Sequence, residues 1–331
     1  MATLKYDRSK FLKLIGLSSL GLISSGMSAS ALSKFGGEES LFSAPPIRVA
    51  HLTDIHIESG IEAERGLASC LNAVNSLNHK PDFIINGGDA IMNSALTYSK
   101  EKIKKQWGLF HSIFRSENSI PITNCIGNHD LVGWPIAKSN EKESKYRAME
   151  EYEMNKPYYS LTKGKWKFIV LDSIQCKNSI PGYFAQLDEE QMNWLKEELS
   201  NTPQDNFICI ISHVPILAIC TMFDSLFTKK RHRMVSSSIL HADAGELTSM
   251  FYQFPNVKSC LSGHIHMIDH VNYLGVDYYC NGAVSGSWWK GNHHQFPPSF
   301  SIMNFFDDGK VTREIHCYNW NQSTKISVTQ N

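Results

Sequence analysis

Residues 47–56 read IRVAHLTDIH, an apolar run that ends in two polar side chains separated by one residue. The part Ile47–Thr53 is typical of a β-strand, and the stretch 62–78 that follows has leucine and valine at helical spacing. A second apolar run, Asp82–Asn86, precedes another helical stretch around Lys100–Phe114. Strands that alternate with helices in this way predict a layered α/β architecture.

Polar residues follow five of the predicted strands, each at the point where the strand ends. The five blocks are Asp54-Ile55-His56, Gly88-Asp89, Gly127-Asn128-His129-Asp130, Ser212-His213 and Gly263-His264-Ile265-His266. In an open α/β sheet, ligands bind at the carboxyl ends of the strands, so we expect these blocks to meet at one rim. A glycine before Asp89, Asn128 and His264 allows sharp turns that bring the backbone close to an ion.

Each block has a simpler explanation when it is taken alone. An aspartate and a histidine two residues apart are common at strand edges, and Gly88-Asp89 is typical of a turn. His213, before Val214-Pro215, suits a buried core histidine equally well. His264 and His266 are more specific, because alternate residues of an extended segment point to the same side. The joint occurrence of all five blocks, in this order, favours metal binding.

Together the five blocks resemble the signature of the calcineurin-like metallophosphoesterases, over residues 47–282. This resemblance implies a four-layer α/β/β/α sandwich, in which two mixed β-sheets pack face to face and helices flank them. The bacterial cyclic-nucleotide phosphodiesterase and purple acid phosphatase branches look most similar. Phosphoprotein phosphatases of the family carry an aspartate and an arginine where this chain has Met92 and Asn93, which argues against that activity.

The resemblance also implies two metal ions. The resemblance assigns Asp54, His56 and His266 to one ion. It assigns Asn128, His213 and His264 to the other ion, and Asp89 bridges the two. Mixed imidazole and carboxylate ligation suits Fe, Mn or Zn rather than Mg or Ca. Such a pair of ions shares a hydroxide that attacks phosphorus, so the expected reaction is hydrolysis of a phosphate ester.

His129 is not a ligand in this scheme. The resemblance places it facing the phosphate, where it protonates the leaving oxygen or stabilises transition-state charge, and Asp130 is expected to orient it. The rival class is a binding protein that kept the fold and lost the chemistry. Such a protein would show a substituted ligand or a replaced His129, and this sequence shows neither. A structural single-metal site is closed by four ligands, whereas seven candidates are present.

Two segments are expected to contact the substrate. The chain between His213 and Gly263 is long for one crossover, so we expect a lid at about 218–245, in which Arg231 and Arg233 pair with phosphate oxygens.

Trp288 and Trp289 occupy a Gly/Ser-rich loop after the last ligand pair, and suit stacking on an organic group of the substrate. Packing beneath the loop is the alternative. A stacking platform beside a phosphate site favours a small phosphodiester, such as a nucleotide or lipid-headgroup diester. The alternative is a phosphomonoesterase, similar to acid phosphatases, on the same metal site.

Composition adds few constraints. Lys and Arg number 32, as do Asp and Glu, so the formal net charge is zero and no field favours a nucleic-acid polymer. The eight cysteines are scattered singly and most lie in apolar runs, so buried free thiols are the main interpretation and disulfides the alternative. Several histidines lack ligand-rich neighbours and are expected to be structural: His51, His79, His111, His241 and His270.

The first residues have the pattern of a secretory signal. Basic residues precede the apolar run Leu14–Met27, and Ala29 and Ala31 give a cleavage site, so we expect a signal peptide at 1–31 and export to the periplasm or beyond. Ser9 stands where a twin-arginine signal has its second arginine, which leaves the export route open. A membrane-adhering helix is the alternative. The run is too short to span a bilayer comfortably, so no transmembrane span is expected after signal removal.

The rest of the chain divides at residues with no strand or helix pattern. We expect a linker at 32–46, the catalytic domain at 47–319 with a β-rich part from 257, and a tail at 320–331.

Overall fold

The computed structural model describes residues 45–94, 99–131, 141–176, 182–223, 228–229, 232–318 and 320. The expected signal peptide, nearly all of the expected linker and most of the expected tail lie outside the described residues. Arg231 also lies outside them, and for Arg233 only the backbone is described. Among the described residues, no helix has the length and apolar character needed to cross a membrane.

The first sheet is mixed. Its order is β15-β14-β1-β2-β3, with β1, β2 and β3 parallel and β14 and β15 antiparallel to their neighbours. The strands are β1 (Ile47–Leu52), β2 (Phe83–Asn86), β3 (Ile122–Asn124), β14 (Ser299–Phe305) and β15 (Val311–Cys317).

The second sheet has the order β12-β13-β11-β8-β5-β4, with parallel strands in the middle and an antiparallel strand at each edge. Its strands are β4 (Tyr159–Lys163), β5 (Trp166–Val170), β8 (Phe207–Ile211), β11 (Val257–Ser262), β12 (Ile268–Tyr273) and β13 (Val276–Asn281). Short strands β6 (Ile174–Cys176) and β7 (Tyr183–Ala185) form a separate pair.

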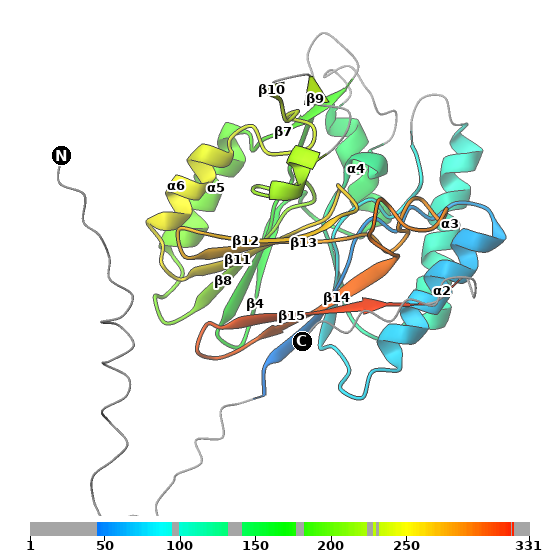
Figure 1. Ribbon diagram of the computed structural model, residues 1–331, viewed down its shortest axis with the longest axis horizontal. Helices are drawn as coiled ribbons and strands as arrows, with labels where there is room; N and C mark the ends of the chain where they lie inside the picture. The colour runs from blue at the N-terminus through cyan, green and yellow to red at the C-terminus, as the bar shows by residue number, and fades with distance from the viewer. Residues whose placement is uncertain are drawn as a thin grey trace, which may run out of the picture. The chain divides into compact units, whose positions relative to one another are not determined.

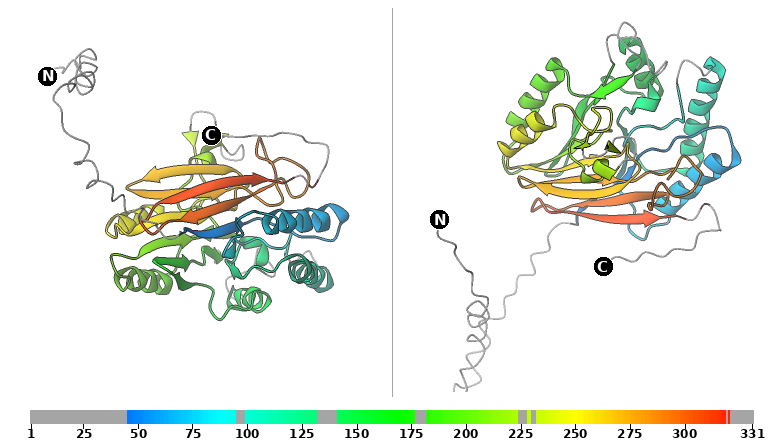
Figure 2. Two further views of the ribbon diagram at one scale, coloured as in Figure 1. Left: turned by 90° about the horizontal axis from the view of Figure 1, so that it is seen from below. Right: turned by 45° about the horizontal axis from the view of Figure 1, so that its top comes forward.

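Helices cover the outer face of each sheet (Figure 1). They are α2 (Ile61–Asn75), α3 (Lys100–Glu117), α4 (Glu141–Glu151), α5 (Glu189–Ser200) and α6 (Ala244–Tyr252). Figure 1 shows α5 and α6 on one side of the strands and α2 and α3 on the other, and the second view of Figure 2 shows the same layers. The α5 helix has a capped N-terminus, because the side chain of Asp188 accepts a hydrogen bond from the Gln191 amide.

Of the apolar cores among the described residues, the three largest hold these layers together. Leu67 of α2 and Trp107 of α3 belong to the core over the first sheet, and Leu195 of α5 belongs to the core over the second. Between the sheets, side chains of both inner faces interdigitate, with Ile85 from one sheet and Phe168 from the other. The structure therefore confirms the expected four-layer sandwich.

All eight cysteines are free, and all but Cys317 are buried. The disulfide alternative is therefore wrong for this structure. Burial raises the pKa of the Cys209 thiol to about 12, as is typical of an unreactive core thiol.

The register of the strands brings their carboxyl ends to one rim. In the first sheet Leu52 pairs with Asn86, and Asn86 pairs with Asn124, so the residues that follow leave the sheet side by side. In the second sheet Leu261 pairs with Ile211, so the segments after β11 and β8 also leave together. The five polar blocks, which follow these strands, therefore lie close together at this rim.

Candidate metal centre

The structure brings the predicted ligands together in two groups that could each hold a metal ion. Within each group, one ligand atom per residue lies within 4.8 Å of the others. One group is Asp54, His56 and His266, and the other is Asp89, His213 and His264. Both groups draw on both sheets, because the aspartates follow strands of the first sheet and His213, His264 and His266 follow strands of the second.

Asp89 lies between the two groups. Its Oδ2 atom is 3.2 Å from His213 Nε2 and 3.7 Å from His56 Nε2. Asn128, the remaining predicted ligand, places its Oδ1 atom 3.3 Å from His213 Nε2. A single carboxylate oxygen thus reaches toward both halves of the cluster.

Backbone carbonyls determine which ring nitrogen faces the cluster. His213 Nδ1 lies 2.8 Å from the Gly87 oxygen, and His264 Nε2 lies 2.9 Å from the Ser238 oxygen. Because a carbonyl only accepts, these nitrogens carry the hydrogen, and the opposite nitrogen of a neutral ring carries a lone pair. His266 is held in the same way by the Gly286 oxygen at 2.5 Å.

The nitrogens that face inward crowd one another. His213 Nε2 and His264 Nδ1 are 3.2 Å apart, and His56 Nε2 and His266 Nε2 are 3.0 Å apart. Asp54 Oδ1 is buried and has no hydrogen-bond partner among the described residues. Ring nitrogens and a carboxylate oxygen at these distances need positive charge or hydrogen among them, and a metal ion supplies such charge. The donor set therefore fits bound metal ions.

Electrostatics agree with this conclusion. Burial lowers the pKa of His56 to about 4 and that of His264 to about 3, so both rings are neutral ligands at pH 7. Burial also acts against a charged His213, but the charges of Asp89 and Asp54 raise its pKa to about 9. Two buried carboxylates thus create a site that favours positive charge.

The backbone at the ligands is unusual. Five of the seven candidates have a positive φ, a conformation that residues other than glycine seldom adopt. The values are 55° for Asp54, 48° for His56, 56° for Asp89, 70° for His264 and 53° for His266. Such backbones persist where the surrounding structure enforces them, and they cluster at functional sites.

Glycines allow the ligand loops to touch. A Cβ atom on Gly127 would lie 2.2 Å from Asp89 Oδ1, and one on Gly263 would lie 2.3 Å from Asp54 Oδ2. Asp54 Oδ2 also accepts hydrogen bonds from the His264 amide at 2.8 Å and from the Thr53 hydroxyl at 2.7 Å. Only glycine fits at these two positions without moving a ligand.

We expect Gly263→Ala to lower kcat/KM about a hundredfold, because a small misplacement of a ligand has an effect of that order. Gly108→Ala is the matched control, since a Cβ at Gly108 of α3 meets no atom within 4 Å. The control should keep full activity and unfold at the same or a higher temperature. Unchanged kcat/KM in the Gly263→Ala protein would show that Asp54 tolerates displacement.

His129 lies at the edge of the cluster, half-buried. Its ring centroid is 4.6 Å from that of His56, and it forms a third possible ligand group with His56 and Asp89. The Met92 carbonyl contacts its Nδ1 atom at 2.5 Å, and its backbone amide donates to Asp89 Oδ1 at 2.8 Å. The ring is therefore oriented by Met92.

Asp130 joins the loops that carry Asp89 and Asn128. Its buried carboxylate accepts hydrogen bonds from the amides of Asp89, Ala90 and Gly127 at 2.8–3.0 Å, and from the Tyr152 hydroxyl at 2.8 Å. Burial and the nearby charge of Asp89 raise its pKa to about 6. The side chain thus shapes the two ligand loops, and an effect of Asp130 on the His129 ring stays a prediction.

The two adjacent tryptophans differ. Trp288 is half-buried, and its ring centroid is 4.5 Å from that of His266 and 5.9 Å from that of His56. Trp289 is only 5% exposed and donates from Nε1 to the His56 carbonyl at 2.9 Å. Its ring packs against Gly66 of α2. The prediction of substrate contact therefore fails for Trp289, which fills the core, whereas Trp288 lies beside the candidate ligands.

Sequence reasoning missed three residues that border the site. The Tyr183 hydroxyl lies 3.2 Å from His264 Nε2, and the Ser238 carbonyl contacts the same atom. The ring of His293 lies 5.5 Å from that of His266 and 5.6 Å from that of Trp288. Only His293 gave a signal, since it follows the tryptophan loop. Ser238 lies in the expected lid, which therefore reaches the cluster.

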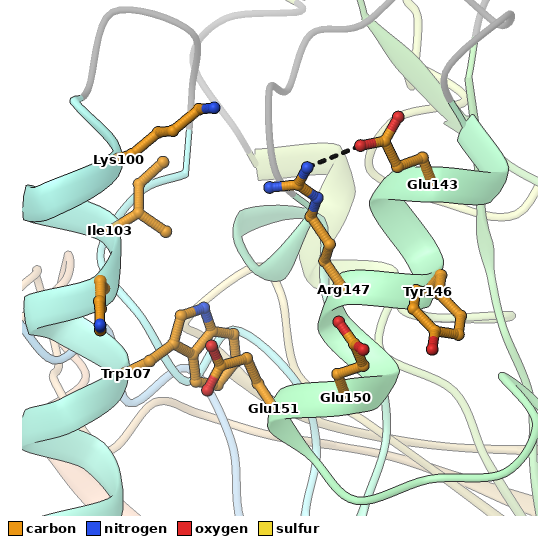
Figure 3. Close-up of a pocket in the computed structure, with 9 residues that line it drawn as sticks. Lys100, Ile103, Trp107, Glu143, Tyr146, Arg147, Glu150 and Glu151 are labelled. Atoms are coloured by element: carbon orange, nitrogen blue, oxygen red, sulfur yellow. Dashed lines mark hydrogen bonds and ion pairs between the residues drawn. The ribbon is translucent and has the colours of Figure 1, made fainter.

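A groove with a volume of about 570 Å³ lies between α3 and α4. Lysines and Trp107 of α3 line one wall, and three glutamates of α4 line the other (Figure 3). Arg147 is paired with Glu143 at 2.6 Å, and none of the lining residues belongs to the ligand groups. The groove is separate from the candidate metal centre.

Comparison with known proteins agrees with this geometry. The model of the calcineurin-like phosphoesterase family matches residues 47–267. The chain belongs to this family. As a calcineurin-like phosphoesterase it is a metal-dependent phosphoric ester hydrolase, and the family works with a dinuclear metal centre.

Curated relatives of this calcineurin-like phosphoesterase include cyclic-nucleotide phosphodiesterases. It is 23% identical to the 3′,5′-cyclic adenosine monophosphate phosphodiesterase CpdA of Escherichia coli, over 82% of this chain and 89% of the relative. It is 24% identical to a 3′,5′-cyclic-nucleotide phosphodiesterase of Nostoc, over 86% and 97%. Among solved structures, a dimetal phosphatase from Danio rerio superposes with a TM-score of 0.59 at 11% identity, over 83% of this chain and 100% of that one.

Proposed function

We propose that this phosphoesterase hydrolyses a small phosphodiester, with cyclic nucleotides as the first candidates. One ion would be held by Asp54, His56 and His266, and Asp89 would join it to a second. The ligands of the second ion would be Asn128, His213 and His264. Bound there, the ions supply Lewis acidity toward the phosphate oxygens and activate water, which suits Fe, Mn or Zn.

His129 would act on the substrate itself. Its Nδ1 atom is engaged by the Met92 carbonyl, so Nε2 is the atom that exchanges a proton with the leaving oxygen or donates to the phosphate. Its half-buried ring lies 4.6 Å from that of His56, so a phosphate bound on the ions would lie near it. Asp89 accepts the His129 amide and thereby fixes the backbone under this ring.

The position of Trp288 beside the candidate metal ligands is the main support for the diester assignment. Its half-buried ring lies against His266, so an organic group attached to a phosphate on the metal ions would meet an aromatic surface. A monoester has one such group, whereas a diester places one on each side of phosphorus. The similarity to cyclic-nucleotide phosphodiesterases supports the same choice. A phosphomonoesterase on the same centre is the second candidate.

We expect kcat/KM for bis(p-nitrophenyl) phosphate to exceed that for p-nitrophenyl phosphate when Mn²⁺ is supplied. Trp288→Ala should reduce the diester value about tenfold, because stacking contributes about 1–3 kcal/mol. Trp288→Phe, which keeps an aromatic face, should retain most of it. Trp194→Ala, on α5, is the control. A tenfold preference of the wild-type protein for the monoester would overturn the diesterase assignment and leave the metal centre intact.

A further inference from the structure

Three buried residues form a polar chain beside His213. Ser212 Oγ lies 3.0 Å from His241 Nε2, and His241 Nδ1 lies 2.8 Å from Asp243 Oδ1. The three residues are 2%, 3% and 9% exposed, so water does not compete for these contacts. A buried polar chain of this kind stabilises one arrangement strongly, because each unpaired member would lose its hydrogen bonds without replacement.

Further contacts hold both ends of this chain. The Ser212 hydroxyl also lies 2.8 Å from the Val214 carbonyl. Asp243 accepts from His241 Nδ1, and its other oxygen accepts from the Leu187 amide at 2.9 Å. His241 therefore uses both ring nitrogens, Nδ1 toward Asp243 and Nε2 toward Ser212.

His241 holds both ends of the turn that presents His213. Its side chain contacts Ser212, the residue before, and its backbone amide donates to the carbonyl of Pro215 at 3.0 Å. His213 is the residue whose Nε2 atom meets Asp89 and Asn128. A shift of this turn would move that nitrogen away from both partners.

The far end of the chain is anchored to rigid elements. Asp243 precedes the first residue of α6, and its carbonyl accepts the Leu247 amide at 3.0 Å. The Ala242 amide donates to the Ala185 carbonyl of β7 at 2.8 Å. His241 is thus fixed by a helix on one side and a strand on the other, and can transmit that position to His213.

The same segment also contacts the second histidine of this half of the centre. Ser238 presents its carbonyl to His264 Nε2, and Ser237 accepts the Ala185 amide at 2.6 Å. Tyr183, from the same strand β7, places its hydroxyl 3.2 Å from His264 Nε2. Residues 237–243 therefore contact His264 and the residues on either side of His213, and they lie near the end of the expected lid.

We propose that His241 is a positioning residue for the Asp89–His213–His264 half of the metal centre. Through Ser212 and Pro215 it keeps His213 aligned with Asp89, and so sets the metal affinity of this half. The other half, Asp54–His56–His266, does not depend on it. This inference rests on the metal assignment made under the proposed function, and it extends to a histidine that the sequence indicated was only structural.

The test is a Mn²⁺ titration by calorimetry of metal-free wild-type protein and three variants, with folding checked by circular dichroism. His241→Phe removes both ring nitrogens, His241→Gln keeps a hydrogen-bonding amide near the Nε2 position, and His241→Asn keeps one near Nδ1. We expect His241→Phe to bind one Mn²⁺ as wild type does and the second 10–100-fold more weakly, as is typical of residues behind a ligand.

The paired amide variants separate positioning from packing. His241→Gln should bind the second ion more tightly than His241→Asn, because only glutamine can still reach Ser212. Leu195→Ala, on the buried face of α5, is the control for lost stability and should keep both affinities. Two unchanged Mn²⁺ affinities in His241→Phe would overturn the proposal, as would equal affinities in the two amide variants. If His241→Phe does not fold, the amide pair decides.

The result can be separated from the proposed function. Failure of the wild-type protein to bind two ions would refute the metal centre and this inference together. Two bound ions without diester hydrolysis would refute only the substrate, because the titration does not use turnover.

Discussion

Replacing Asp89 with alanine is expected to abolish turnover and to lower the content of both metal ions. Its Oδ2 atom reaches His213 at 3.2 Å and His56 at 3.7 Å, so both halves of the centre lose a carboxylate at once. Losing the several kcal/mol that metal ions supply to the transition state corresponds to about a thousandfold or more in kcat/KM. The measurement is kcat/KM for bis(p-nitrophenyl) phosphate beside metal analysis of the purified protein.

Two further variants make this result specific. Asp89→Asn keeps the shape and tolerates the positive φ of 56°, but lacks the charge, so it should hold less metal than wild type in a folded protein. Asp205→Ala, at an exposed position in the loop before β8, should behave as wild type. Near-normal turnover of Asp89→Ala with two ions retained would show that Asp89 does not bridge.

His129→Ala is expected to keep both metal ions and to lose about 10²–10⁴ in kcat, the usual contribution of a positioned general acid. The loss should be larger for diesters with poor leaving groups than for nitrophenyl esters, because a poor leaving group needs its proton more. His111→Ala, a histidine on α3 paired with Glu151 at 2.9 Å, is the control.

Metal content decides between two roles for His129. The ring lies close enough to His56 and Asp89 to serve as a ligand. A fall in metal content parallel to the fall in kcat would make it a ligand or a structural residue, rather than a group that acts on phosphate.

The sequence predicts the layers and the convergence of the ligands because both follow from local patterns. Strand and helix periodicity is a property of short segments, and parallel strands in register bring their carboxyl ends to the same rim. Asp54, Asp89 and Asn128 were therefore foreseeable, since each follows a parallel strand of the first sheet. The pairing of two sheets face to face came from the family resemblance and not from any local pattern.

Contacts between distant segments were not foreseeable. Trp288 and Trp289 are neighbours of the same type, and only the hydrogen bond to the His56 carbonyl and the space beside Gly66 place the second in the core. His241 has no ligand-like neighbours in the sequence, because its partners Ser212 and Pro215 lie 29 and 26 positions earlier. Its role depends on the fold, which brings residue 241 against the turn at 212–215.

The left-handed backbones at five ligands bear on how such a protein can change. Each left-handed residue other than glycine costs roughly 1–2 kcal/mol, and total folding stability is typically about 5–15 kcal/mol. Asparagine or glycine at Asp54, His56 or His266 would relieve part of that burden while removing a ligand. Selection for thermal stability alone would therefore favour substitutions that remove metal ligands and abolish catalysis. Only selection for turnover retains these residues.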